Sequence, residues 1–158
     1  MKKNQRGITL IALGITLAIM VVLIGIVVST VVTIIETGKL QELSTNMLLI
    51  QAKAKTIAEK YNFDETSVTL VGTINTDNIN TLKTVGSVTN TQNISLMYTL
   101  SETDISDFGL TNLKLKSGEA FVVDYSSLDV EVYYIPGFEH NGTTYYELSK
   151  IMEISVNE

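Results

Sequence analysis

A long uncharged run near the N-terminus constrains this chain more than any other feature. From Ile8 to Ile35 there are 28 consecutive residues without a charged side chain or a proline. As an α-helix the run would extend for about 42 Å, which exceeds the ~30 Å hydrocarbon core of a bilayer. Isoleucine and valine dominate it and favour strands in water, but in lipid only a helix satisfies its own backbone groups. We therefore expect a transmembrane helix over residues 8–35; the alternative, a buried helix of a soluble core, would be unusually long.

The charges on either side of the run predict its orientation. Lys2, Lys3 and Arg6 precede it without any acidic residue, and Glu36 is the first charge after it. Positive residues are retained on the cytoplasmic side, so the N-terminus is expected inside and everything after Glu36 outside. A secretory signal peptide has a shorter apolar core of about 7–15 residues followed by a small-residue cleavage site. We therefore expect a single-pass protein of the cytoplasmic membrane.

The junction between the basic residues and the run carries a resemblance to a known family. The leader, residues 1–7, ends in Gly7 and is followed by Ile-Thr-Leu-Ile-Ala-Leu over residues 8–13. This segment resembles the N-terminal signal of type IV pilins and type II secretion pseudopilins. The resemblance implies cleavage after Gly7 by a prepilin peptidase, N-methylation of Ile8, and assembly with other pilin or pseudopilin subunits.

One position departs from that family pattern. Ala12 stands where the family usually carries a glutamate, which is thought to neutralise the terminal amine of a neighbouring subunit. A lone charge in hydrocarbon is costly, so such pairing guides docking. Some tip or minor subunits, and some Gram-positive members, lack this acid too. Ala12 therefore favours a minor or tip subunit over the major filament subunit.

Four small residues inside the run share one face of the expected helix. At about 100° per residue, they fall within about 60° of one another. They form two pairs with a spacing of four: Gly14 with Ala18, and Gly25 with Ser29. Such faces allow close approach of helices in lipid. The alternative is that glycine and serine are simply common in membrane helices, so both interpretations stay open.

An amphipathic pattern continues beyond the run, over residues 36–61. Its apolar positions follow one another at spacings of three and four residues over three heptads: Leu40, Leu43, Met47, Ile50, Ala54, Ile57 and Tyr61. This spacing predicts a helix. Leu48 and Leu49 widen the stripe, which favours packing on a sheet over the alternative, a coiled-coil seam. We expect one long helix from Ile8 to about Tyr61.

The remainder, residues 62–158, is expected to be an extracytoplasmic domain. Residues 64–95 are rich in threonine and asparagine and suggest a variable, mobile connection with weak strands, such as residues 67–71. Ser101 to Asp104 predicts a capping box for a short helix that Gly109 ends. Strands are expected within about 119–148: residues 119–125 and 130–134 as a hairpin ended by Pro136-Gly137, then a turn at 140–142 and a third strand.

This pattern predicts an α+β fold in which a long N-terminal helix packs on a small antiparallel sheet. The amphipathic stripe and the apolar face of the hairpin each need a partner, and they complete each other. The resemblance implies the same pilin-like lollipop. The segment from Phe121 to Tyr125, with the turns after it, also resembles the C-terminal sheets of Gram-positive pseudopilin-like proteins, though more weakly.

Composition argues against several classes of metal site and active site. The absence of cysteine excludes a disulfide framework, thiolate metal sites and a cysteine nucleophile, and the single histidine, His140, excludes paired-histidine metal motifs. Asp104 with Asp107, and Asp124 with Asp129, are possible calcium ligands, but no segment matches a twelve-residue calcium loop. A net charge of -6 argues against nucleic-acid binding. We expect no enzyme activity, cofactor or metal.

Two classes of function remain. The first is a structural subunit of a type IV pilus-like filament or a type II secretion-like pseudopilus, with membrane lipid, prepilin peptidase and other subunits as partners. After assembly such a subunit would be part of a cell-surface filament. The second is a single-pass, membrane-anchored extracytoplasmic binding domain that does not polymerise.

Overall fold

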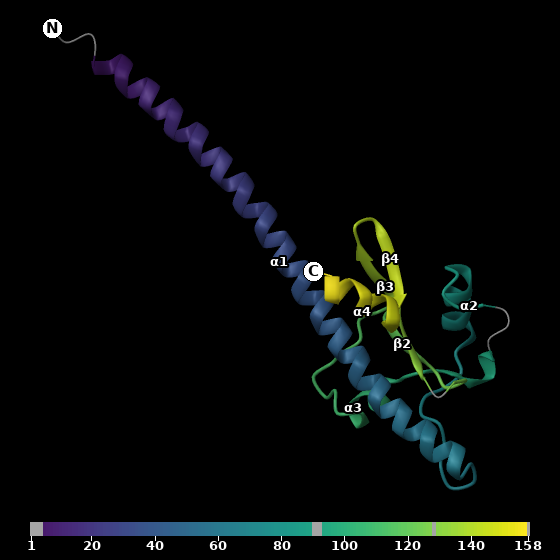
Figure 1. Ribbon diagram of the computed structural model, residues 1–158. Helices are drawn as coiled ribbons and strands as arrows, with labels where there is room; N and C mark the ends of the chain where they lie inside the picture. The colour runs from purple at the N-terminus through teal and green to yellow at the C-terminus, as the bar shows by residue number, and fades with distance from the viewer. Residues whose placement is uncertain (1–4, 90–92, 128, 158) are drawn as a thin grey trace. The chain divides into compact units, whose positions relative to one another are not determined.

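The computed structural model describes residues 5–89, 93–127 and 129–157, and Figure 1 shows their fold. Contacts divide the chain into two units, Met1–Lys39 and Leu40–Glu158. One helix, α1 (Gln5–Phe63), includes residues of both. For residues 5–15, 18–19, 21–34 and 157 only the backbone conformation is described. The predicted span, residues 8–35, therefore lies almost entirely outside the described side chains.

Among the residues that the structure describes, no helix combines the length and the apolar content that crossing a membrane requires.

The second unit is an α+β structure built on one sheet. After α1 come α2 (Thr76–Thr84), the 3₁₀ turn η1 (Ile94–Leu96), β1 (Met97–Thr99), α3 (Glu102–Asp107), β2 (Ala120–Asp124), β3 (Glu131–His140), β4 (Thr143–Glu147) and α4 (Leu148–Asn157). The four strands form a wholly antiparallel sheet in the order β1-β2-β3-β4. The predicted α+β class with a small antiparallel sheet is confirmed.

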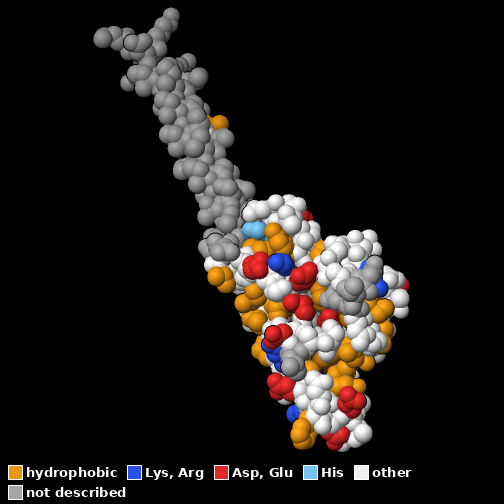
Figure 2. Space-filling model, turned by 45° about the vertical axis from the view of Figure 1, so that its right-hand side comes forward, with side chains coloured by type: hydrophobic (Ala, Val, Ile, Leu, Met, Phe, Trp, Pro, Cys, Tyr) orange, Lys and Arg blue, Asp and Glu red, His pale blue; other side chains and the backbone are white. Residues whose placement is uncertain are grey.

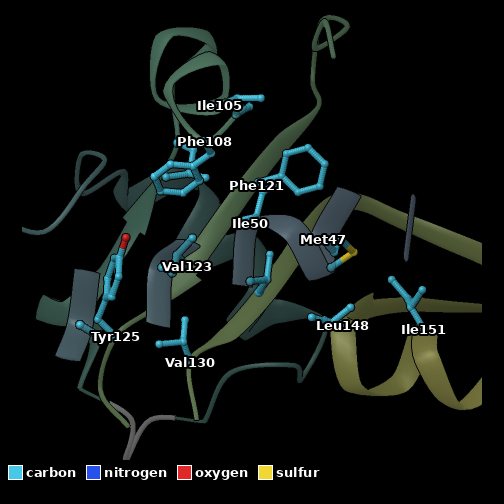
Figure 3. Close-up of a cluster of buried hydrophobic side chains, with 14 of the residues drawn as sticks. Met47, Ile50, Ile105, Phe108, Phe121, Val123, Tyr125, Val130, Leu148 and Ile151 are labelled. Atoms are coloured by element: carbon cyan, nitrogen blue, oxygen red, sulfur yellow. The ribbon is translucent and has the colours of Figure 1, made fainter. Parts of the chain in front are cut away.

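The main core lies between α1 and one face of the sheet. Met47, Ile50 and Ala54 of α1 are completely buried, as are Val123 and Val132 of the sheet. Figure 3 shows Met47, Ile50 and Val123 in this core, together with Ile105 of α3 and with Leu148 and Ile151 of α4. The amphipathic stripe therefore packs on a sheet of its own chain rather than forming a coiled-coil seam.

A second core covers the opposite face of the sheet. Ile79 and Leu82 of α2 pack with Met97, Val122 and Tyr133. All five residues of β2 are consequently buried, because helices cover the strand from both sides. The side chain of Asn75 accepts hydrogen bonds from two backbone N–H groups and caps α2 at its N-terminus.

The expectation for residues 64–95 is wrong in two respects, because this segment contains the helix α2 and lacks the expected strand. Residues 67–71 contain no strand. Gly72 adopts a positive φ of 108°, and only Thr73 pairs with the sheet, as a single bridge to Thr99. A Cβ on Gly72 would lie 2.8 Å from the Thr99 carbonyl oxygen, so this close approach requires glycine.

The C-terminal hairpins confirm most of the strand predictions and correct one. β2 and β3 pair with Val123 opposite Val132, and the turn at residues 141–142 joins β3 to β4. Pro136-Gly137 does not end β3, because the strand continues to His140 through a register shift between Tyr133 and Phe138. The sequence did not predict α2, β1 or α4.

The capping box predicted at residues 101–104 is confirmed. The backbone N–H of Asp104 donates to Ser101 Oγ at 3.2 Å, and the backbone N–H of Ser101 donates to Asp104 Oδ2 at 2.8 Å. These bonds begin α3, whose Ile105 is fully buried in the main core. Gly109, with φ 93°, follows the C-cap, as the sequence predicts.

Candidate functional site

The residues predicted for processing and membrane packing fall in the part of α1 without described side chains. The backbone of Gly7 and Ile8 lies within α1. The small residues of the predicted packing face also lie outside the described side chains: Gly14, Ala18, Gly25 and Ser29. Cleavage after Gly7, methylation of Ile8 and close helix packing therefore stay predictions.

The second half of α1 presents one face to solvent. Thr45, Leu49, Ala52 and Thr56 follow one another at spacings of three and four, and all are exposed. Leu48 and Leu49 retain 39% and 46% of their accessible surface. The expectation that these two leucines widen the buried stripe is therefore wrong. Leu49 lies on an uncharged ridge, which we define as Thr45, Leu49, Ala52 and Thr56.

Two polar contacts link α1 to the sheet. Gln51 Nε2 donates a hydrogen bond to the Val130 carbonyl oxygen at 2.7 Å. One turn further, Lys55 Nζ lies 2.9 Å from Asp129 Oδ1. Both partners sit at the start of β3 or just before it. Both contacts lie beside the buried stripe, and burial of that stripe against the sheet leaves the uncharged ridge facing solvent.

The carboxylates considered as calcium ligands all have local structural roles or are exposed. Asp104 belongs to the capping box of α3, and Asp129 pairs with Lys55. Asp124 is buried and accepts a hydrogen bond from the backbone N–H of Ser126 at 2.9 Å, while Asp107 is exposed. Within the described residues, no three acidic, histidine or cysteine side chains are grouped as a metal site requires.

The surface of the second unit is acidic. Residues 40–158 contain 16 aspartate and glutamate residues against 7 lysines. Figure 2 shows acidic side chains scattered across the visible face rather than gathered in one patch. A hollow of about 250 Å³ lies beside α1, lined by Glu42, Asn46 and residues 109–113. This hollow mixes carboxylate, amide and aliphatic groups, and no arrangement in it indicates a reaction.

Two tyrosines of the main core have pKa values above the ordinary value for tyrosine. Burial raises the pKa of Tyr125 to about 12, and its hydroxyl donates a hydrogen bond to the Val71 carbonyl oxygen at 3.3 Å. Burial and a hydrogen bond with Glu119 raise the pKa of Tyr134 to about 12. Both effects oppose formation of the phenolate. These tyrosines therefore act as structural groups at ordinary pH.

A pair of glutamates at the start of α4 was not predicted from the sequence. Glu131 accepts hydrogen bonds from the backbone N–H groups of Val132 and Ser149. Glu147 is half-buried beside it, and burial together with the charge of Glu131 raises the pKa of Glu147. The two residues are 16 positions apart, and no motif links them in the sequence.

The chain matches no protein-family model, no curated protein and no solved structure. Its function must therefore be argued from its own residues.

Proposed function

We propose that the chain is a structural subunit of a type IV pilus-like filament or a type II secretion-like pseudopilus. The order of features at the N-terminus carries this proposal: a basic leader ending in Gly7, an apolar Ile8, and an uncharged run to Ile35. The α+β unit supports it, because the amphipathic continuation of that run packs on a small sheet of the same chain. A filament subunit needs these two parts, an apolar helix for assembly and a folded domain outside.

Processing is the first step of the proposed function. Prepilin peptidase cleaves the peptide bond after Gly7, and the new amine of Ile8 becomes methylated. Cleavage removes Lys2, Lys3 and Arg6 and takes the net charge from -6 to -9. The amine is then the one positive group ahead of Glu36, at the end of an uncharged helix.

The solvent-exposed side of α1 is suited to packing against neighbouring subunits. The uncharged ridge carries no formal charge, so another helix can approach it without desolvating an ion. Burial of the stripe against the sheet leaves this ridge facing outward. The folded unit therefore leaves one side of its helix free for assembly.

Ala12 assigns the subunit a minor place in the proposed assembly. Without a carboxylate four residues after Ile8, the chain cannot neutralise the amine of a subunit docked beside it. Its own amine can still pair with a glutamate on a different subunit that carries the acid. This asymmetry fits a position at the tip or at initiation, in few copies.

The copy number in sheared surface filaments tests this proposal. We expect the processed chain in the filament fraction, far below the major subunit in quantitative mass spectrometry. Ala12→Glu should raise its share, because charge pairing in lipid favours docking, whereas Ala12→Gln, of similar size without charge, should not. Near-equal stoichiometry for the parent would refute the minor role. Complete absence from filaments, with the leader intact, would favour the anchored binding domain instead.

A further inference from the structure

The C-terminal helix α4 is attached to the sheet by one apolar and one acidic contact region. Leu148 and Ile151 are fully buried in the main core, with Met152 and Ile154 partly buried beside them. The acidic region lies at the first turn of α4, where β3 begins and β4 ends. Its two members, Glu131 and Glu147, belong to neighbouring strands.

Glu131 holds the N-terminus of α4. Its Oε1 accepts a hydrogen bond from the backbone N–H of Ser149 at 3.2 Å, and a second from Val132 at 3.3 Å. The first N–H groups of a helix have no partner within the helix, and its N-terminus favours negative charge. Glu131 of strand β3 therefore supplies the carboxylate that α4 lacks in its own first turn.

Glu147 lies close to this carboxylate because of the strand register. It pairs with Tyr133 across the β3–β4 ladder, and Glu131 precedes Tyr133 by two residues on the same face. Residues in this diagonal relation are near enough for long side chains to interact, and like charges destabilise each other. Both glutamates are half-buried, so water screens the repulsion incompletely.

The other groups around Glu147 offset only part of the effect of burial and of the Glu131 charge on its pKa. From α4, Lys150 attracts the carboxylate and Glu153 repels it, and these two lie 3.7 Å apart as an ion pair of their own. From the segment after α2, the Ser87 side chain forms a hydrogen bond with Glu147 that favours the ionised form. Burial and the charge of Glu131 outweigh these effects, and the pKa of Glu147 is raised.

We propose that Glu131 and Glu147 form an acid-strengthened latch, in which protonation of Glu147 tightens the attachment of α4 to the sheet. Oε1 of Glu131 accepts hydrogen bonds from the backbone N–H groups of Val132 and Ser149, so this carboxylate is the part of the latch that holds the first turn of α4. Protonation of Glu147 removes the repulsion without removing the bond to Ser149. The domain thereby responds to the pH of the medium at a helix that covers part of its core.

The direction of the effect follows from the raised pKa. The folded unit disfavours the ionised form of Glu147 relative to the unfolded chain, so ionisation of Glu147 lowers the free energy of unfolding. The stabilisation by protonated Glu147 is therefore complete at a pH below 4.5, its pKa in the unfolded chain. It is lost as the pH rises through the higher pKa of the folded unit. Above the folded pKa of Glu147, α4 is in its more weakly attached state, and opening of α4 uncovers Leu148 and Ile151.

Hydrogen exchange in the full-length chain in detergent micelles tests this latch. Glu147→Gln keeps the size of the side chain and is permanently neutral. Glu139→Gln is the matched control, because Glu139 is an exposed glutamate of β3 and its replacement removes the same charge. Parent and variants are compared at the same pH, with the amides of α2 as an internal reference.

At neutral pH we expect the amides of α4 to exchange several-fold more slowly in Glu147→Gln than in the parent. Glu139→Gln should match the parent, and the difference should disappear at about pH 4.5. In the parent alone, α4 should gain protection relative to α2 as the pH falls. Equal exchange at neutral pH, a difference that persists in acid, or an equal effect of Glu139→Gln would overturn the latch.

Discussion

The two neighbouring residues Ile50 and Leu49 provide a sharp test of how α1 packs. Ile50 is fully buried in the main core, whereas Leu49 retains 46% of its surface on the uncharged ridge. Replacing either by alanine removes three carbon atoms from the same turn of the same helix. The two variants therefore differ in the environment of the lost atoms and in little else.

The expected costs differ several-fold. Loss of three buried carbons costs about 2.5 kcal/mol in transfer free energy, and the cavity left behind brings Ile50→Ala to about 2–5 kcal/mol. Leu49→Ala should cost less than about 1 kcal/mol, because half of its surface already meets water. For a unit of this size, Ile50→Ala should lower the melting temperature by about 10 °C.

Thermal and urea unfolding of a fragment starting at Gly38 measures both values. The boundary at Lys39 predicts that this fragment folds by itself, and we expect a soluble monomer in size-exclusion chromatography. Tyrosine circular dichroism provides the signal, since the chain has no tryptophan. Equal losses for the two variants would contradict the packing of α1, and a dimeric fragment would indicate that the stripe is an intermolecular seam.

Three further predictions concern the sheet and its helices. Gly137→Ala should destabilise the fold by more than about 1 kcal/mol, measured by urea unfolding, because Gly137 has a φ of 91° and a new Cβ would lie 2.9 Å from the Tyr146 ring. In an absorbance titration at alkaline pH, two tyrosines should ionise near pH 12; Tyr125→Phe and Tyr134→Phe should each remove one of them. Their raised pKa values also predict that stability falls as the pH rises from about 10 to about 12, so a melting temperature unchanged over this interval would contradict their burial. Ser101→Ala should cost about 0.5–2 kcal/mol through loss of the cap of α3, and a melting temperature equal to that of the parent would show that the capping box contributes nothing.

The parts of the fold that follow a clear period could be predicted from the sequence. The spacing of Leu40, Met47, Ile50 and Ala54 predicted the buried face of α1, and alternation predicted the hairpin of β2 and β3. Turn chemistry located the capping box of α3 and the turn after His140. In each case local propensity and burial agree, so the pattern is readable without tertiary information.

The elements that depend on tertiary packing could not be predicted. α2 is rich in threonine and asparagine, which are weak helix formers, and its burial of Ile79 and Leu82 on the sheet outweighs that preference. β1 has only three residues, too few for an alternating pattern. Pro136 argues against a strand, but the register shift in β3 accommodates it.

The candidate functional residues also divide into those that the sequence suggests and those that only the fold brings together. The leader and Gly7 could be proposed from the sequence because a membrane signal is linear in it, and they stay predictions. Glu131 and Glu147 could not, because only the register of β3 against β4 brings them together. The exposure of Leu48 and Leu49 was likewise hidden, since an apolar residue next to a stripe can lie on either side of its edge.

Mass spectrometry of the N-terminal peptide, from protein extracted from its native membrane, tests the central claim most directly. The proposed function predicts a peptide that begins at Ile8 and carries a methyl group on its amine. Gly7→Leu should abolish this peptide, whereas Gly38→Leu, at an exposed position with open space around it, should leave it unchanged. An intact leader beginning at Met1 in the parent would contradict the account.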